Sequence, residues 1–157
     1  MLDVQSTKWM TTYCDTLHPL TKLASLQKQV KAAGTDPAKV KPLIVGAFQT
    51  SGTALTATAT KLKSAKAPTL TRFGSDLPGL LGKISALGAT LTADGKKVAA
   101  VDPKKNPQGF VTAVQKYAPD LDKFASALGV GAGLKIPVAA LPEIKRIPSC
   151  VGLITTA

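Results

Sequence analysis

Histidine and glutamate each occur once in this chain of 157 residues, and arginine occurs only twice. A hydrolytic triad would need His18 as its base, with a nucleophile and a carboxylate beside it. Cys14 lies one helical turn before His18 and has the chemistry of a nucleophile. However, Pro19 pushes the backbone of His18 out of a helix, and Cys14 has another partner available in Cys150. The sequence therefore predicts a protein that is not an enzyme.

Aromatic residues are also scarce, at 4% of the chain, whereas apolar residues make up 45%. The core must therefore consist of Leu, Val, Ile and Ala, which suits close-packed helices better than an aromatic-rich sheet. No apolar run is long enough for a transmembrane helix. The first ten residues lack the basic start and apolar centre of a signal peptide, as the mature form of an exported protein also would. The length fits a single domain, residues 1–157.

Acidic residues are few compared with basic ones. Twenty Lys and Arg stand against nine Asp and Glu, which gives a net charge of +11. Such a surface attracts polyanions, although solubility alone would also explain it. Nearly all the cations are lysine, whereas specific reading of nucleic acid favours arginine, interleaved aromatics or a recognisable module. We therefore expect an anionic or apolar component of the cell envelope as the partner, and no sequence-specific nucleic acid.

Apolar residues recur at helical spacing through most of the chain, and strand-like alternation is missing. Pro19 predicts a kink or break near His18, with a second helix beginning at Pro19. Asp36 and Pro37 have the pattern of an N-cap followed by proline at the first helical position. The predicted helices cover residues 7–33 with that break, 37–66, 76–101, 110–128 and, in a short last helix, 141–147. Together they predict an all-α, monomeric, antiparallel bundle of four longer helices and a short C-terminal one.

The two cysteines lie near opposite ends of the chain. Cys14 and Cys150, without a cluster of histidines, indicate one disulfide better than a metal site. The bond would attach the last segment to the first helix, and the loss of chain entropy would contribute about 5 kcal/mol to stability. It favours an extracytoplasmic protein, either secreted or envelope-associated. A cytosolic protein with two inert buried thiols is the alternative.

The segment from Trp9 to His18 contains the only tryptophan and the only histidine of the chain. Met10, Tyr13, Cys14 and His18 are all side chains that can ligate iron or copper. A haem or metal carrier that uses His18 and Tyr13 is therefore one alternative function. The competing interpretation is that Trp9 and Tyr13 face the core while His18 ends a helix.

Two further segments are candidates for a binding site. Thr50–Thr60 combines five threonines with Ser, Gly and Ala, so that it could pack closely against another helix or line a polar-walled cavity. Gly129–Pro137 is a loop that is unusually rich in apolar residues. Helix bundles hold ligands between their helices. We predict that an apolar or anionic ligand would contact Thr53, Thr56, Thr60, Val130, Leu134 and Ile136. A protein-interaction module that uses the apolar loop is the other alternative.

In composition the chain resembles small exported helical proteins of actinobacteria that are rich in Ala, Thr and Lys. The resemblance rests on Trp9 and Cys14 near the start and on the closing segment Ile147–Cys150. It implies an extracytoplasmic setting with a disulfide, and it implies no activity and no characterised family.

Overall fold

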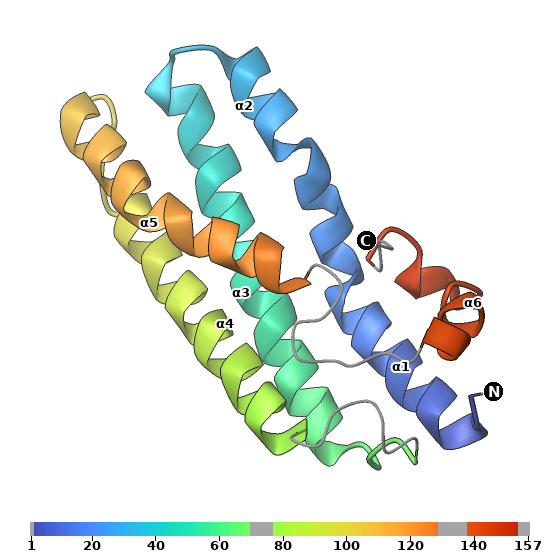
Figure 1. Cartoon of the computed structure of the whole chain (residues 1–157). Coiled ribbons are helices and arrows are strands. Elements are labelled where there is room, and N and C mark those ends of the chain that lie inside the picture. The colour runs from blue at the N-terminus through green and yellow to red at the C-terminus, as the bar shows by residue number, and fades with distance from the viewer. Residues whose placement is uncertain (1, 70–76, 129–137, 154–157) are drawn as a thin grey trace.

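The computed structural model describes residues 2–69, 77–128 and 138–153, except for the side chains of 124–128. Its helices are α1 (Val4–Leu17), the 3-10 helix η1 (His18–Ser25), α2 (Leu26–Ala33), α3 (Pro37–Ser64), α4 (Leu77–Ala99), α5 (Pro107–Leu128) and α6 (Leu141–Ile144). Short 3-10 turns, η2 (Val138–Ala140) and η3 (Pro148–Cys150), lie before and after α6. The described residues contain no strand. The predicted all-α antiparallel bundle, with four longer helices and a short last one, is confirmed (Figure 1).

Helix α3 is the centre of the bundle. It contacts α1, η1 and α2 along one side, and α4 and α5 along the other. The predicted cap is present, because Asp36 Oδ1 accepts a hydrogen bond from the backbone amide of Ala38 at 3.0 Å and Pro37 opens the helix. Phe48 and Leu55 of α3 are fully buried among mostly aliphatic neighbours from α1, α4 and the C-terminal segment.

The predicted break near His18 is present, and the second helix that follows it is a 3-10 helix. Proline has no amide hydrogen and crowds the preceding turn, so the α-helical hydrogen bonds cannot continue through it. The chain forms the 3-10 helix η1 instead, and α-helix resumes only at Leu26. The predicted last helix is also shorter than expected, since α6 ends at Ile144. The predicted loop Gly129–Pro137 lies outside the described residues.

Helices α3 and α4 approach each other most closely at glycines. A Cβ atom built on Gly52 would lie 3.0 Å from the backbone nitrogen of Thr92 and 3.1 Å from the carbonyl oxygen of Gly88. A Cβ atom on Gly95 would lie 2.8 Å from Cβ of Phe48. Distances this short leave no space for a side chain, so backbone packs against backbone. Of the two interpretations of the Thr50–Thr60 segment, close packing is the one that the structure confirms at Gly52.

Threonine hydroxyls along the helices donate to carbonyl oxygens of their own helix, four residues back. The hydroxyl is thereby satisfied within the helix. On α3, the buried Thr58 donates to Ala54 O at 2.7 Å, and its oxygen also lies 2.7 Å from Thr16 Oγ1 on α1. A hydrogen bond from the hydroxyl to the carbonyl oxygen four residues back also occurs at Thr11, Thr12, Thr16, Thr60, Thr92 and Thr112.

The predicted disulfide joins Cys14 of α1 to Cys150 of η3, with Cα atoms 4.9 Å apart. Both cysteines are buried, and the C-terminal segment lies beside α1 (Figure 1). Two further contacts hold the same segments together. The backbone amide of Leu2 donates to Glu143 Oε2 at 2.8 Å, and His18 Nδ1 lies 3.3 Å from the carbonyl oxygen of Ser149. Within the described ranges, no helix is long and apolar enough to cross a membrane.

Candidate functional site

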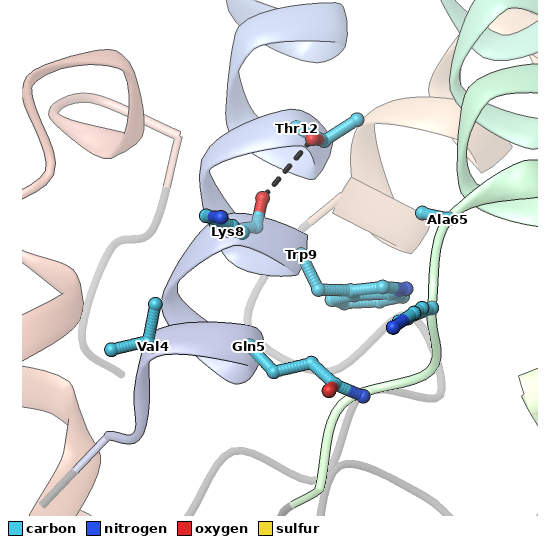
Figure 2. Close-up of a pocket in the computed structure, with 7 residues that line it drawn as sticks. Val4, Gln5, Lys8, Trp9, Thr12 and Ala65 are labelled. Atoms are coloured by element: carbon cyan, nitrogen blue, oxygen red, sulfur yellow. Dashed lines mark hydrogen bonds between the residues drawn. The ribbon is translucent and has the colours of Figure 1, made fainter.

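A surface groove of about 460 Å³ lies beside Trp9, between the start of α1 and the segment that follows α3. Its lining residues on α1 recur at helical spacing and so share one face of that helix. Figure 2 shows the indole ring of Trp9 extending from α1 toward Ala65, with the side chain of Gln5 beside it. The described residues that line it are Val4, Gln5, Lys8, Trp9, Thr12, Ala65 and Lys66.

The floor of the groove is rigid because Trp9 is part of the core. Its ring is only 2% exposed and stacks on the ring of Tyr13, with centroids 5.7 Å apart and planes inclined by 10°. Stacked aromatic pairs stabilise each other beyond the area they bury. The groove therefore reaches only part of the indole ring, and the rest anchors α1 in the bundle.

Hydrogen bonds hold the segment after α3 against the start of α1, and so fix the width of the groove. Gln5 Nε2 donates to the carbonyl oxygen of Ala67, and Thr69 Oγ1 donates to Asp3 Oδ2. Asp3 also caps α1, since its Oδ1 accepts from the amide of Ser6 at 2.8 Å. The hydrogen bond from Thr69 is the largest cause that lowers the pKa of Asp3 to about 2. The carboxylate thus remains charged at any physiological pH.

Charge in the groove is positive. Lys8 and Lys66 line it and are exposed, and none of the described residues in the lining is a carboxylate. Val4 adds an apolar side chain that is 73% exposed. The groove thus combines an exposed apolar side chain with two ammonium groups above an almost wholly buried indole ring, which is suited to a molecule with an apolar body and an anionic group.

The predicted ligand-binding residues do not line this groove. Thr53, Thr56 and Thr60 are exposed on α3, and the hydroxyl of Thr60 donates to the carbonyl oxygen of Thr56 at 2.9 Å. The other three predicted contacts lie outside the described residues, namely Val130, Leu134 and Ile136. A ligand site at these positions stays a prediction.

The two predicted haem or metal ligands have different surroundings. Tyr13 is buried, and burial raises the pKa of its hydroxyl to about 12, which keeps it in the neutral phenol form. His18 is exposed, with its ring near Ser149 at the end of α1. The described residues contain no group of three or more His, Cys, Asp or Glu side chains that could hold a metal ion. The haem or metal site stays a prediction that this arrangement does not favour.

A buried carboxyl group forms a second unusual feature, at the contact between α4 and α5. Asp94 of α4 is 4% exposed, and no hydrogen-bond donor of the described residues reaches its Oδ2. Lys97, mostly exposed, lies 3.7 Å from Oδ1. Burial raises the pKa of Asp94, and its hydrogen-bonded neighbour Asp120 on α5 adds to the shift. The same hydrogen bond lowers the pKa of Asp120, so in this pair Asp94 is the carboxyl that holds a shared proton to higher pH.

We predict that Asp94→Asn stabilises the protein at neutral pH by about 1–2 kcal/mol, because the neutral amide can donate to Asp120 at every pH and leaves no buried charge. The native carboxyl has a raised pKa, so the folded state binds more protons than the unfolded one above the ordinary aspartate value of 3.8. The contribution of Asp94 to the free energy of unfolding is therefore fully present below pH 3.8, and it is lost as the pH rises through the pKa of Asp94 in the folded protein. Urea unfolding at several pH values should show that the free energy of unfolding falls less from acidic to neutral pH in Asp94→Asn than in the wild type.

Asp122→Asn is the matched control for this prediction. It removes an exposed carboxylate on α5, two residues after Asp120. It should change the free energy of unfolding by less than about 0.5 kcal/mol. Equal pH profiles for wild type and Asp94→Asn would show that no shared proton exists between the two helices.

Sequence reasoning singled out Trp9 because it is the only tryptophan, but it did not find the groove. The groove depends on a contact between α1 and Ala65–Lys66, which no local pattern reveals. The only feature of the sequence that relates to the groove is the presence of a lysine, Lys8 and Lys66, in each of the two segments that form it.

Comparison with protein-family models, curated proteins and solved structures found no match for this chain. This agrees with a resemblance confined to two short segments.

Proposed function

We propose that this protein is a non-enzymatic, exported binding protein that holds an anionic amphiphile in the groove beside Trp9. The observation that carries the proposal is the groove itself, with the buried Trp9 beneath it, an exposed apolar wall at Val4 and lysines at positions 8 and 66. Its volume of about 460 Å³ falls within the range of ligand sites, roughly 300–1,000 Å³. The proposal keeps the ligand class that the sequence predicts and moves its site from the interior to the first turns of α1.

The lining explains why an anionic group together with an apolar body is the best fit. An uncharged apolar ligand would leave both ammonium groups without a partner, and a small anion would leave the apolar wall in water. Exposed ion pairs contribute only about 0.2–1 kcal/mol each, so the charges orient the ligand and the apolar body supplies most of the affinity.

The disulfide supports the exported setting in this proposal. Cys14 and Cys150 are within bonding distance and buried, and disulfides persist in oxidising compartments such as the periplasm or the outside of the cell. An envelope contains many anionic amphiphiles, which is consistent with the proposed ligand class.

Dodecanoate and dodecanol provide a direct test, because they share an apolar chain and differ in charge. Trp9 is the only tryptophan, so its emission reports on the groove without labelling. We expect both molecules to change the emission, with tighter binding of dodecanoate. The double variant Lys8→Gln and Lys66→Gln should weaken dodecanoate binding about tenfold, from two lost exposed ion pairs. Dodecanol binding should be unchanged in that variant.

The matched control is Lys61→Gln with Lys63→Gln, which removes the same charge from the end of α3 without touching the lining. It should leave the affinity for dodecanoate within about twofold, since neither lysine lines the groove and salt weakens the attraction between exposed charges that are not in contact. Equal weakening in both double variants, or no response of Trp9 to either ligand, would refute a site in the groove.

A further inference from the structure

Lysines gather at the end of the bundle that lies opposite the groove. The turn between α2 and α3 and the loop between α4 and α5 lie at the same end of the molecule, whereas the start of α1 and the end of α3 lie at the other (Figure 1). We call residues 28–41 and 96–105 together the basic end. It contains only two carboxylates, Asp36 and Asp102, against eight lysines: Lys28, Lys31, Lys39, Lys41, Lys96, Lys97, Lys104 and Lys105.

A hydrogen bond joins the two segments of the basic end. Lys41 Nζ of α3 donates to the carbonyl oxygen of Val101, just after α4, at 2.8 Å. The antiparallel pairing of α3 with α4 places the start of one helix beside the end of the other over the same region. The lysines of both segments therefore form one surface rather than two separate ones.

The carboxylates at this end are already engaged in capping. Asp36 Oδ1 accepts from the amide of Ala38 at 3.0 Å, and Asp102 Oδ1 accepts from the amide of Lys104 at 2.9 Å. Within the part of the chain that the structure describes, the only lysine of the basic end in a salt bridge is Lys97, which pairs with Asp94. The other charges are exposed or donate to backbone, so their field extends into solvent.

The composition of the basic end indicates what kind of anion it fits. Neither segment contains an arginine or an aromatic residue, so it lacks the side chains that clamp phosphates bidentately or stack on bases. The exposed large apolar side chains, Val4, Val111, Val138 and Val151, also lie outside both segments. What remains is a diffuse positive charge without an inserting wedge, as in juxtamembrane polybasic segments that adsorb to anionic leaflets.

We propose that the basic end docks the protein on a bilayer that contains anionic lipids. Docking in this orientation would point the groove beside Trp9 away from the membrane and leave it open to solvent. The proposal rests on the lysines of the basic end alone. It holds whether or not the groove binds an amphiphile, because the two surfaces share no residue.

Vesicle sedimentation tests the proposal with the full-length protein at about 100 mM salt, where the Debye length is about 10 Å. We expect binding to vesicles of equal parts phosphatidylglycerol and phosphatidylcholine, and none to phosphatidylcholine alone. Each lysine near such a surface increases partitioning about fivefold. The triple variant Lys31→Gln, Lys39→Gln and Lys105→Gln should therefore lower the partition coefficient about 100-fold.

The control triple is Lys61→Gln, Lys63→Gln and Lys83→Gln, three exposed lysines at the other end of the bundle with the same change in net charge. It should lower partitioning by less than about fivefold, because these charges lie beyond a Debye length from a docked surface. Equal losses in the two triples would overturn the proposed orientation. Retention on duplex DNA, without binding to anionic vesicles at this salt, would assign the basic end to nucleic acid instead.

Discussion

Gly52→Ala should destabilise the protein by about 2–3 kcal/mol, even though alanine is the better helix former. The new methyl group would meet the backbone of Thr92 and Gly88 on α4, and backbone atoms cannot move aside as a flexible side chain can. The two central helices would have to separate, and every apolar contact between them would weaken. Urea unfolding followed by circular dichroism measures the loss.

Gly46→Ala is a sharp control, because it makes the same change in the same helix. A Cβ atom at Gly46 meets nothing within 4 Å. Only the helix propensity changes there, so Gly46→Ala should stabilise the protein by roughly 0.5–1 kcal/mol. The two substitutions should therefore have opposite signs. Equal stabilisation by both would mean that α3 and α4 do not approach as closely as the structure shows.

Replacing both cysteines by alanine should lower the free energy of unfolding by about 3–5 kcal/mol. The disulfide spans a sequence separation of 136 residues, so without it the unfolded chain gains a large number of conformations. The C-terminal segment would also lose its covalent attachment to α1. We expect limited proteolysis to cut the Cys14→Ala, Cys150→Ala variant near η3 well before it cuts the oxidised protein.

Two controls distinguish the stabilisation by the disulfide from the stabilisation by neighbouring contacts. Wild-type protein treated with a reductant in the unfolded state should reproduce the stability of the double variant. His18→Ala, which removes only the contact of the ring with Ser149, should cost less than about 1 kcal/mol because that contact is exposed. An oxidised wild type no more stable than the double variant would exclude a disulfide contribution.

Much of the fold follows from local chemistry. Asp36 and Pro37 fix the start of α3 because a side-chain cap and a proline without an amide hydrogen suit the first turn of any helix. Cys14 and Cys150 could be paired from the sequence because no other thiol competes for either. The break near His18 was predictable from Pro19, whereas the 3-10 form of the helix that follows was not. A proline shows where α-helical bonding stops, but not which backbone conformation replaces it.

The position of the candidate site could not be predicted from the sequence. Periodicity places Trp9 on a helix face, but it cannot show that Lys66 will lie next to that face. Such a contact depends on the lengths of α1 and α3 and on how they pack, which are properties of the whole bundle. The burial of Asp94 could not be predicted either. Its partner Asp120 is on another helix, so the sequence near Asp94 does not distinguish a buried carboxyl group from a solvated one.

The threonines of this bundle affect what determines the register of α3 along α4. Apart from the Thr58–Thr16 contact between α3 and α1, their hydroxyls donate within their own helices, so few polar groups are left to favour one alignment of α3 and α4 over another. A slip of α3 along α4 by one turn, about 5.4 Å, would break few hydrogen bonds between the two helices. It would, however, move Gly52 away from Thr92 and place a residue with a side chain against that backbone. Steric exclusion at three glycines, Gly52, Gly88 and Gly95, therefore determines the register of the two central helices.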